Sequence, residues 1–240
     1  MLTYKEFTEP GNREINEDSI GVCQTDAGIC CVLCDGLGGH GRGEEASKLV
    51  VDSILDSYKN TENAIDHIDE FFENAQKELL GEQKKKNAKF EMKTTATILV
   101  IDSESICWGH IGDSRIYMFK KGKYKMRSID HSVPQMLVMA RDIKEKEIRN
   151  HPDRNKLLRV MGIEWGSGKY VISKKIKRKD NLAFLLCSDG FWELIEEKEM
   201  SDILRKSSDA EAWVNSMAEI VKKNGADKNM DNFSAIAVIL

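Results

Sequence analysis

The sequence predicts an α+β fold in which two antiparallel sheets pack together and helices cover them on the outside. Three observations favour this class. Strand-like apolar segments follow one another in runs, and consecutive strands form antiparallel sheets. Two amphipathic helices come directly one after the other, whereas a doubly wound parallel sheet would alternate single strands with single helices. The strands are also too numerous for one sheet covered by helices.

The first half of the chain contains a strand, a hairpin and two helices. The expected elements are strands over 1–9, 19–25 and 29–34 and helices over 44–58 and 65–79. Pro10-Gly11 ends the first strand, and Asp26-Ala27-Gly28 turns the chain between the next two, which therefore form the hairpin. Both helices carry apolar residues at steps of three and four. The lysine run 84–86 is interpreted as a solvated helix end.

The second half returns to strands. They are expected over 92–101 and 106–111, on both sides of Lys121-Gly122, and over 170–176, 182–187 and 233–240. Between them, residues 130–165 have no long apolar period and are interpreted as a mobile insertion with short helices. A further helix begins at Ser208, which forms a capping box with Glu211, and ends at Gly225.

Length and charge narrow the class of protein. The chain has 240 residues, of which 32% are charged, and a net charge of −4. We expect a single domain over 1–240. The charge balance does not favour nucleic acid or an anionic membrane as partner. No apolar run approaches the length of a membrane span, and the N-terminus lacks the apolar segment of a signal peptide. We therefore expect a cytoplasmic protein, and a monomer.

Cysteine use indicates a reducing environment. The six cysteines lie in or beside apolar, strand-like segments: Cys23, Cys30, Cys31, Cys34, Cys107 and Cys187. We interpret them as buried, reduced thiols. The spacing Cys31-x-x-Cys34 suggests a redox or zinc site, but on an extended strand these two side chains point to opposite faces. That interpretation is discarded.

A glycine-rich bend joins a buried strand to a helix between Ile29 and Ser47. Asp35 follows six apolar or sulfur-bearing residues and precedes four closely spaced glycines, Gly36, Gly38, Gly39 and Gly41. Glycines let the backbone approach a ligand closely. Taken alone, the pattern is equally typical of an ordinary strand-to-helix turn capped by Asp35.

Several carboxylates share one context, an apolar segment on one side and turn-forming residues on the other. They are Asp35 in VLCDG, Asp113 in GHIGDSR, Asp189 in LLCSDG and Asp231 in MDN, with Glu17-Asp18 just before a strand. Asp followed by Gly or Asn is also ordinary turn chemistry. If these strand ends converge, however, the carboxylates repel one another unless a cation neutralises them. Ligands that are all oxygens favour Mg²⁺ or Mn²⁺.

Seven short motifs together resemble a known family. In chain order they are Arg13-x-x-Asn16-Glu17-Asp18, Asp35-Gly36-x-Gly38-Gly39-His40, Thr94-Thr95-Ala96, Gly112-Asp113-Ser114-Arg115, Asp130-His131-Ser132, Ser188-Asp189-Gly190 and Asp231-Asn232. Their order and spacing resemble the type 2C family of metal-dependent serine/threonine protein phosphatases, in its compact bacterial branch. The resemblance extends from Gly11 to the C-terminus.

The resemblance implies a four-layer α-β-β-α sandwich with a two-metal centre, Mn²⁺ or Mg²⁺, at one edge of the sheets. Asp35 would bridge both metals, and the Gly36 carbonyl would bind one. Asp189 and Asp231 would bind the other, while Glu17 and Asp18 act directly or through water. Asp113 would help to hold a third, weaker ion together with Asp189. Arg13 would grip the substrate phosphate, for which a guanidinium fork is well suited.

The implied reaction is hydrolysis of phosphoserine and phosphothreonine in proteins, without a phosphoenzyme. A hydroxide held between the two cations attacks phosphorus in line with the departing oxygen. The substrates would be targets of a serine/threonine kinase. The alternative is a catalytically weak relative that binds phosphoproteins or a kinase, although such proteins usually lack metal ligands, and this chain retains the full set.

Two departures from the family pattern leave alternatives open. Leu37 stands where some members carry a histidine acid, so His40 or a metal-bound water would protonate the leaving group, or His40 only caps the following helix. The insertion at 131–165 corresponds to the family's flap, and it reads Met139-Ala140-Arg141-Asp142 where a glycine is usual.

Two other site classes are rejected. Gly36-x-Gly38-x-x-Gly41 matches the dinucleotide-binding fingerprint, but that fingerprint needs a βαβ unit, and here a second helix follows the first. Another kind of two-metal hydrolase would show histidine ligands, yet only His40 and His131 fall near these motifs.

Overall fold

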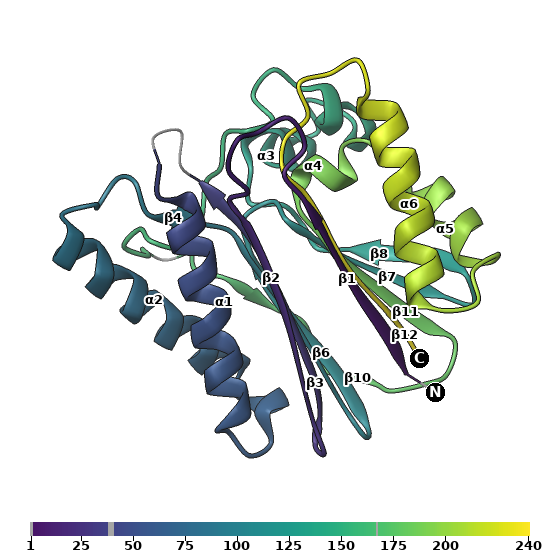
Figure 1. Cartoon of the computed structure of the whole chain (residues 1–240), viewed down its shortest axis with the longest axis horizontal. Helices are drawn as coiled ribbons and strands as arrows, with labels where there is room; N and C mark the ends of the chain where they lie inside the picture. The colour runs from purple at the N-terminus through teal and green to yellow at the C-terminus, as the bar shows by residue number, and fades with distance from the viewer. Residues whose placement is uncertain (1, 38–40, 167) are drawn as a thin grey trace.

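A computed structural model describes residues 2–37, 41–166 and 168–240 and contains four layers (Figure 1). One sheet has the strand order β1 (Thr3–Glu9), β12 (Phe233–Ile239), β11 (Leu182–Cys187), β7 (Arg115–Lys120) and β8 (Lys123–Arg127). The other has the order β10 (Ile176–Lys177), β6 (Ser105–Ile111), β5 (Ala96–Asp102), β3 (Gly28–Leu37) and β2 (Asp18–Thr25). β4 (Lys93–Thr94) pairs with β3, and β9 (Val171–Ile172) pairs with β6. All described pairs are antiparallel, which confirms the predicted class.

Helices cover both outer faces. α1 (Gly43–Lys59) and α2 (Ile68–Lys86) lie on the sheet that contains β3, while α5 (Glu197–Leu204) and α6 (Ala210–Gly225) lie on the sheet that contains β12 (Figure 1). The insertion forms α3 (Val133–Ala140) and a 3₁₀ segment over Glu145–Asn150, and α4 (Asp189–Trp192) follows β11. None of the described helices combines the length and the apolar composition needed to cross a bilayer.

Strand β3 is apolar throughout because both of its faces are buried. Cys30, Val32 and Cys34 pack under α1 and α2, whereas Cys31 and Leu33 belong to the core between the two sheets. The opposite orientation of Cys31 and Cys34 is therefore confirmed. All six cysteines are free and buried, as expected.

Several predicted elements need correction. The strand predicted over 170–176 is two short strands, β9 and β10, and the helix predicted from 65 begins at Ile68 after a separate 3₁₀ turn over Ala64–Asp66. The strand predicted over 92–101 divides at Thr95 into β4 and β5. The helix cap is Asp209, not Ser208, because the Asp209 side chain accepts a hydrogen bond from the Ala212 amide at 2.8 Å. The short helices α4 and α5 were not predicted.

The pairing explains why the predicted carboxylates meet. In antiparallel neighbours, the start of one strand lies beside the end of the next. The start of β2 therefore lies beside the end of β3, and the start of β12 lies beside the end of β11. β6 is antiparallel to β5, which is antiparallel to β3, so β6 ends at the same edge as β3. All the carboxylate-bearing turns thus gather at one edge of the sandwich.

Candidate metal centre

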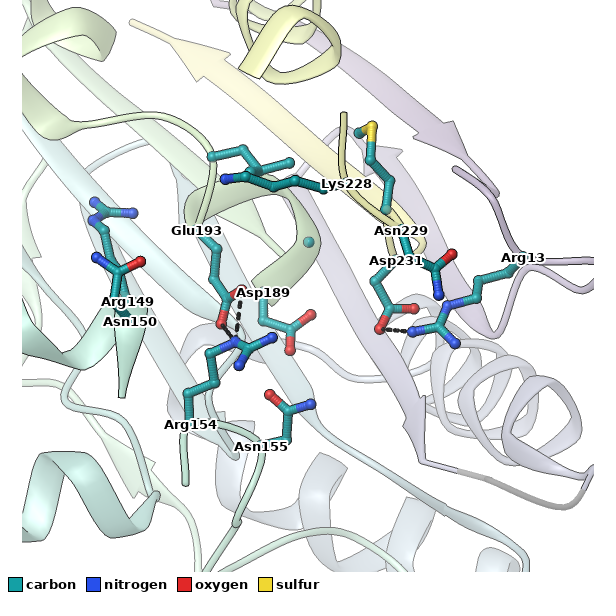
Figure 2. Close-up of a pocket in the computed structure, with 13 residues that line it drawn as sticks. Arg13, Arg149, Asn150, Arg154, Asn155, Asp189, Glu193, Lys228, Asn229 and Asp231 are labelled. Carbon is teal, nitrogen blue, oxygen red and sulfur yellow. Dashed lines mark hydrogen bonds and ion pairs between the residues drawn. The ribbon is translucent and has the colours of Figure 1, made fainter. Parts of the chain in front are cut away.

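The carboxylates gather around a cleft of about 640 Å³ at this edge. Of the residues expected from the sequence, those that line it are Arg13, Glu17, Asp35, Gly36, Asp113, Asp189 and Asp231. A second recess of about 500 Å³ shares Arg13, Asp189 and Asp231 and extends toward the flap (Figure 2). Asp18 is the one expected ligand not on the cleft surface, since it is buried beside Asp35.

Asp18 and Asp35 are direct cross-strand partners on β2 and β3. Ser188 Oγ donates a hydrogen bond to Oδ2 of Asp18 at 2.8 Å. The other oxygen of Asp18 is buried and has no hydrogen-bond partner among the described residues. A buried carboxylate oxygen without a partner is costly, and a bound cation would satisfy it.

Four carboxyl groups at this edge, those of Asp18, Asp35, Asp113 and Asp189, have raised pKa values. Burial raises the pKa of Asp18 to about 7, and the nearby charges of Asp189 and Asp231 add to this effect. Burial, followed by repulsion from Asp231, raises the pKa of Asp189 to about 6. Burial and the neighbouring carboxylates also raise the pKa of Asp35 and Asp113. Desolvation and like charge both oppose ionisation of these carboxyl groups. A bound cation would have the opposite effect and would favour their ionised forms.

The backbone of Asp35 is held from both sides, which leaves its side chain free for a ligand. Its amide donates to Thr95 Oγ1 at 2.9 Å, while its carbonyl accepts from Thr94 Oγ1 at 2.8 Å and from the Thr95 amide at 2.9 Å. These contacts explain the Thr94-Thr95 motif and the break between β4 and β5. β3 continues past Asp35 to Leu37, so Asp35 lies within the strand and not at its end.

Gly36 is required because the bend is tightly packed. A Cβ at this position would lie 2.4 Å from the carbonyl oxygen of Gly43 and 2.6 Å from that of Glu17. The Gly36 amide donates to the Glu17 carbonyl at 3.0 Å. Gly36 therefore brings the Glu17 segment against β3. His40, Gly38 and Gly39 lie outside the described residues.

Asn232 positions the N-terminal loop, a role that its sequence motif alone did not reveal. Its Oδ1 accepts from the Glu17 amide at 2.9 Å, and its Nδ2 donates to the carbonyls of Pro10 and Ile15 at 2.9 and 3.0 Å. The loop that carries Arg13 and Glu17 is thereby tied to the start of β12. Arg13 donates to Asp231 at 2.9 Å across the cleft (Figure 2).

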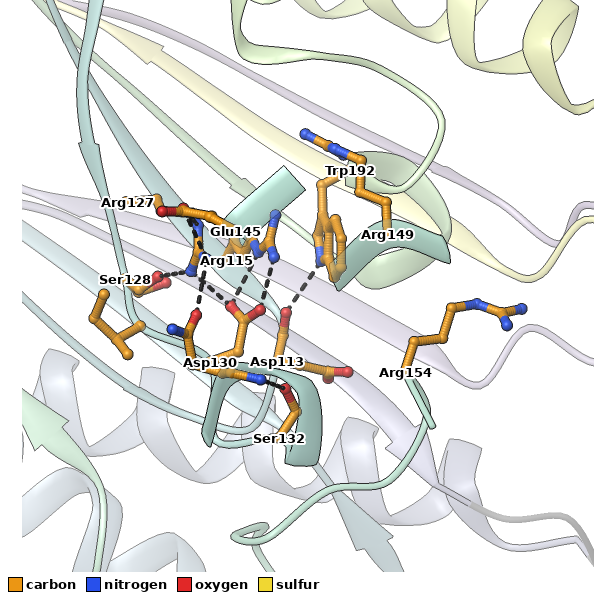
Figure 3. Close-up of polar contacts among 12 residues, drawn as sticks. Asp113, Arg115, Arg127, Ser128, Asp130, Ser132, Glu145, Arg149, Arg154 and Trp192 are labelled. Carbon is orange, nitrogen blue, oxygen red and sulfur yellow. Dashed lines mark hydrogen bonds and ion pairs between the residues drawn. The ribbon is translucent and has the colours of Figure 1, made fainter. Parts of the chain in front are cut away.

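A buried network of ion pairs and hydrogen bonds lies next to Asp113 (Figure 3). Arg115 forms a two-pronged ion pair with Asp130, at 2.9 and 2.7 Å, and Arg127 contacts the same carboxylate at 3.0 Å. Although burial raises the pKa of Asp130, the two arginines hold it below its ordinary value. Trp192 Nε1 donates to the Asp113 carbonyl at 3.0 Å. This contact was not predicted from the sequence.

The flap is joined to the cleft by ion pairs. Nε of Arg154 in the flap lies 3.1 Å from a carboxylate oxygen of Glu193 (Figure 2). Nη2 of Arg149 lies 2.8 Å from a carboxylate oxygen of Glu197. Asn155 and Leu157 of the flap line the cleft. Arg141 stands at the end of α3 with φ of +68°, a left-handed conformation that glycine adopts most easily. Arg141 therefore has a backbone conformation that favours glycine, within the segment where the family usually has one.

The donor set fits a hard divalent cation. It consists of carboxylate and carbonyl oxygens, the ligands that Mg²⁺ and Mn²⁺ prefer. Within the described ranges, no three His, Cys, Asp or Glu side chains are yet gathered closely enough to enclose an ion.

Comparisons with known proteins agree with this geometry. A family model described as "Protein phosphatase 2C" matches residues 11–233. The chain is 31% identical over 204 residues to "Serine/threonine phosphatase stp" of Listeria welshimeri, covering 80% of this chain and 79% of that protein. It is 28% identical over 211 residues to "Protein phosphatase PhpP" of Streptococcus pneumoniae, covering 82% of each.

Solved structures share the fold over the whole chain. Serine/threonine phosphatase Stp1 from Staphylococcus aureus has a TM-score of 0.88 at 27% identity, covering 100% of this chain and 95% of that one. The catalytic domain of PstP in complex with two manganese ions has a TM-score of 0.84 at 23% identity, covering 99% and 97%, and shows likeness of fold.

Proposed function

The chain belongs to the protein phosphatase 2C family and is a serine/threonine protein phosphatase, and we propose that its reaction takes place in the carboxylate cleft. The observation that supports this location is the gathering of Glu17, Asp35, Asp113, Asp189 and Asp231 around one cavity. These residues come from five separate segments of the chain. A shared cation accounts for the gathering of so many acidic groups in one place.

Two divalent cations, Mn²⁺ or Mg²⁺, are the cofactors, as in PstP with its two manganese ions. When bound, they lower the pKa of a water molecule and offset charge on the phosphoryl group. Asp35 and the Gly36 carbonyl would hold one cation, and Asp35, Asp189 and Asp231 would hold the second. Glu17 and Asp18 would complete the set directly or through water. Asp113, together with Asp189, would help to hold a third and weaker ion.

Arg13 binds the substrate phosphate. Its guanidinium lines the cleft, and its only described ion-pair partner is Asp231 at 2.9 Å. Both side chains are about half exposed, at 47% and 46%, so Arg13 is free to turn toward an incoming phosphate. A planar guanidinium offers two parallel donors to phosphate oxygens. Leu37 also lines the cleft and cannot donate a proton.

The substrates are proteins that a serine/threonine kinase has phosphorylated, because that reaction must supply what this enzyme consumes. We place this signalling enzyme in the cytoplasm, which agrees with its six free cysteines. It acts as a monomer of one domain, residues 1–240, with the flap at about 131–165.

The test is hydrolysis of phosphothreonine, phosphoserine and phosphotyrosine peptides with and without Mn²⁺. We expect release of phosphate from the first two, no activity in excess chelator, and recovery on adding Mn²⁺ or Mg²⁺. Binding of phosphopeptide without hydrolysis at any metal concentration would favour the catalytically weak alternative. Full activity in chelator would exclude the metal mechanism.

A further inference from the structure

A second cavity, separate from the catalytic cleft, lies between the flap helix α3 and the strands β6 and β9. We call it the apolar groove; its volume is about 670 Å³. Six of the ten exposed large apolar side chains among the described residues line it: Met126, Ile129, Met136, Met139, Leu158 and Val171. Exposed apolar side chains scattered singly need no explanation, but a gathering of this kind marks a binding surface.

The charges at the apolar groove are positive, although the chain as a whole carries −4. Arg127 and Asp130 at the groove neutralise each other at 3.0 Å. Arg159 and Lys174 also line it, and neither has a carboxylate partner within the described part of the chain. The groove therefore offers apolar surface together with two uncompensated cations.

The groove shares a wall with the catalytic cleft. Leu157 lines the cleft, whereas the next residue, Leu158, lines the groove. The Leu158 amide donates to the His131 carbonyl at 2.8 Å. His131 in turn is bonded twice to Gly112, through its amide at 2.9 Å and its Nδ1 at 3.2 Å. A molecule in the groove would thus contact the residues that fix the turn before Asp113.

We propose that the apolar groove is a binding site for a small amphipathic anion, with an apolar body and one acidic group. The volume falls within the range of roughly 300–1,000 Å³ that is typical of small-molecule sites. Met136, Met139 and Leu158 receive the apolar body, and methionine side chains adapt readily to different shapes. Arg159 and Lys174 pair with the acidic group.

The test uses anilinonaphthalene sulfonate, a fluorescent compound with apolar rings and a single sulfonate. It is titrated into the full chain in the presence of chelator and without phosphate, so the result does not depend on phosphatase activity. We expect one saturable site. Met139→Glu should weaken binding by at least about tenfold, because it places a like charge on the apolar surface. Phe90→Glu is the matched control, since Phe90 is also highly exposed (80% against 73%) but lies outside the groove.

A second pair of variants tests the cations. Lys174→Glu should weaken binding by about tenfold, whereas Lys77→Glu, on an exposed face of α2, should not. The uncharged analogue phenylnaphthylamine should bind to the natural protein more weakly than the sulfonate does. Its affinity for Lys174→Glu should equal its affinity for the natural protein. If Met139→Glu left the affinity for the sulfonate unchanged, the apolar groove would not be the binding site. Equal binding of both compounds to the natural protein would overturn the requirement for an anion.

Discussion

The indole Nε1 of Trp192 donates a hydrogen bond to the backbone carbonyl of Asp113 at 3.0 Å (Figure 3). Trp192 ends the short helix α4, which begins at Asp189. The Trp192 side chain therefore joins the segment that carries Asp189 to the segment that carries Asp113, and both of these carboxylates line the cleft. Its ring is held in turn by Arg115, whose guanidinium lies 3.4 Å from the ring centre, a cation–π contact in a buried setting.

Trp192→Phe should weaken metal binding as well as catalysis. The phenyl ring keeps part of the packing but loses the donor to Asp113, so the two turns are no longer fixed together. We expect Mn²⁺ affinity, measured by calorimetry, to fall by about fivefold or more, in line with the loss of a net hydrogen bond of about 1 kcal/mol. Trp213→Phe is the control, because it loses a similar bond, from its Nε1 to the Met200 carbonyl at 3.1 Å, and neither residue lines the cleft. Equal Mn²⁺ affinity in both variants would contradict the role of Trp192.

Asp35→Asn and Asp189→Asn should each lower phosphatase activity by roughly two orders of magnitude or more, because a neutral amide holds a divalent ion poorly. Their circular dichroism spectra should match that of the natural protein. Asp52→Asn, on the exposed face of α1, should leave activity unchanged. Substantial activity in either cleft variant would show that the reaction uses other ligands.

In chelator, the free energy of unfolding should fall as the pH rises from about 4 to about 7. Asp18 has a pKa of about 7 when folded against an ordinary value of 3.8, so in this range the folded state holds a proton that the unfolded state has released. The stabilising contribution of Asp18 is complete below about pH 4 and lost as the pH passes 7.

Urea unfolding at pH 5 and pH 8 measures the effect. Asp18→Asn should reduce the difference between the two pH values by on the order of 2 kcal/mol, since the amide does not titrate. Asp56→Asn, at an exposed position on α1, should keep the natural difference. An unchanged difference in Asp18→Asn would mean that Asp18 titrates normally.

Arg13→Ala should raise KM for a phosphothreonine peptide by about tenfold or more, because it removes both donors to the phosphate. Arg13→Lys should recover only part of the loss, since an ammonium group cannot form two parallel bonds. Mn²⁺ affinity should change little in either variant. Arg205→Ala removes an arginine from an exposed ion pair with Asp202 and serves as the control. If Arg13→Ala left KM unaltered, Arg13 would be only a partner of Asp231.

Much of the fold and the site could be predicted from local patterns. Apolar periodicity predicted the principal strands and helices, since it reports which faces are buried. The position of Asp35 after six apolar residues, and of Asp189 after another apolar run, indicated rigid carboxylates near strand ends. The motifs then assigned the family, which the comparisons confirmed. The roles of the individual ligands remain proposals.

Short elements could not be predicted in this way. Four residues of α4, or two of β9, carry too little periodicity to be distinguished from a turn. Ser208 and Asp209 are both good helix caps by residue type, and only the folded chain decides between them. There Asp209 accepts from the Ala212 amide, while Ser208 donates to Asp209 at 2.8 Å.

Local patterns in the sequence establish which segments become buried strands and which carboxylates lie at or near the ends of those strands. The tertiary structure alone decided which side chains meet across the sandwich. Trp192 and Asp113 lie 79 positions apart, and Glu17 and Asn232 lie 215 apart, yet each pair shares a hydrogen bond. Local patterns carry no information about such contacts, because the contacts depend on the order in which the described strands pair. Antiparallel pairing then places all of these carboxylates at one edge of the sandwich.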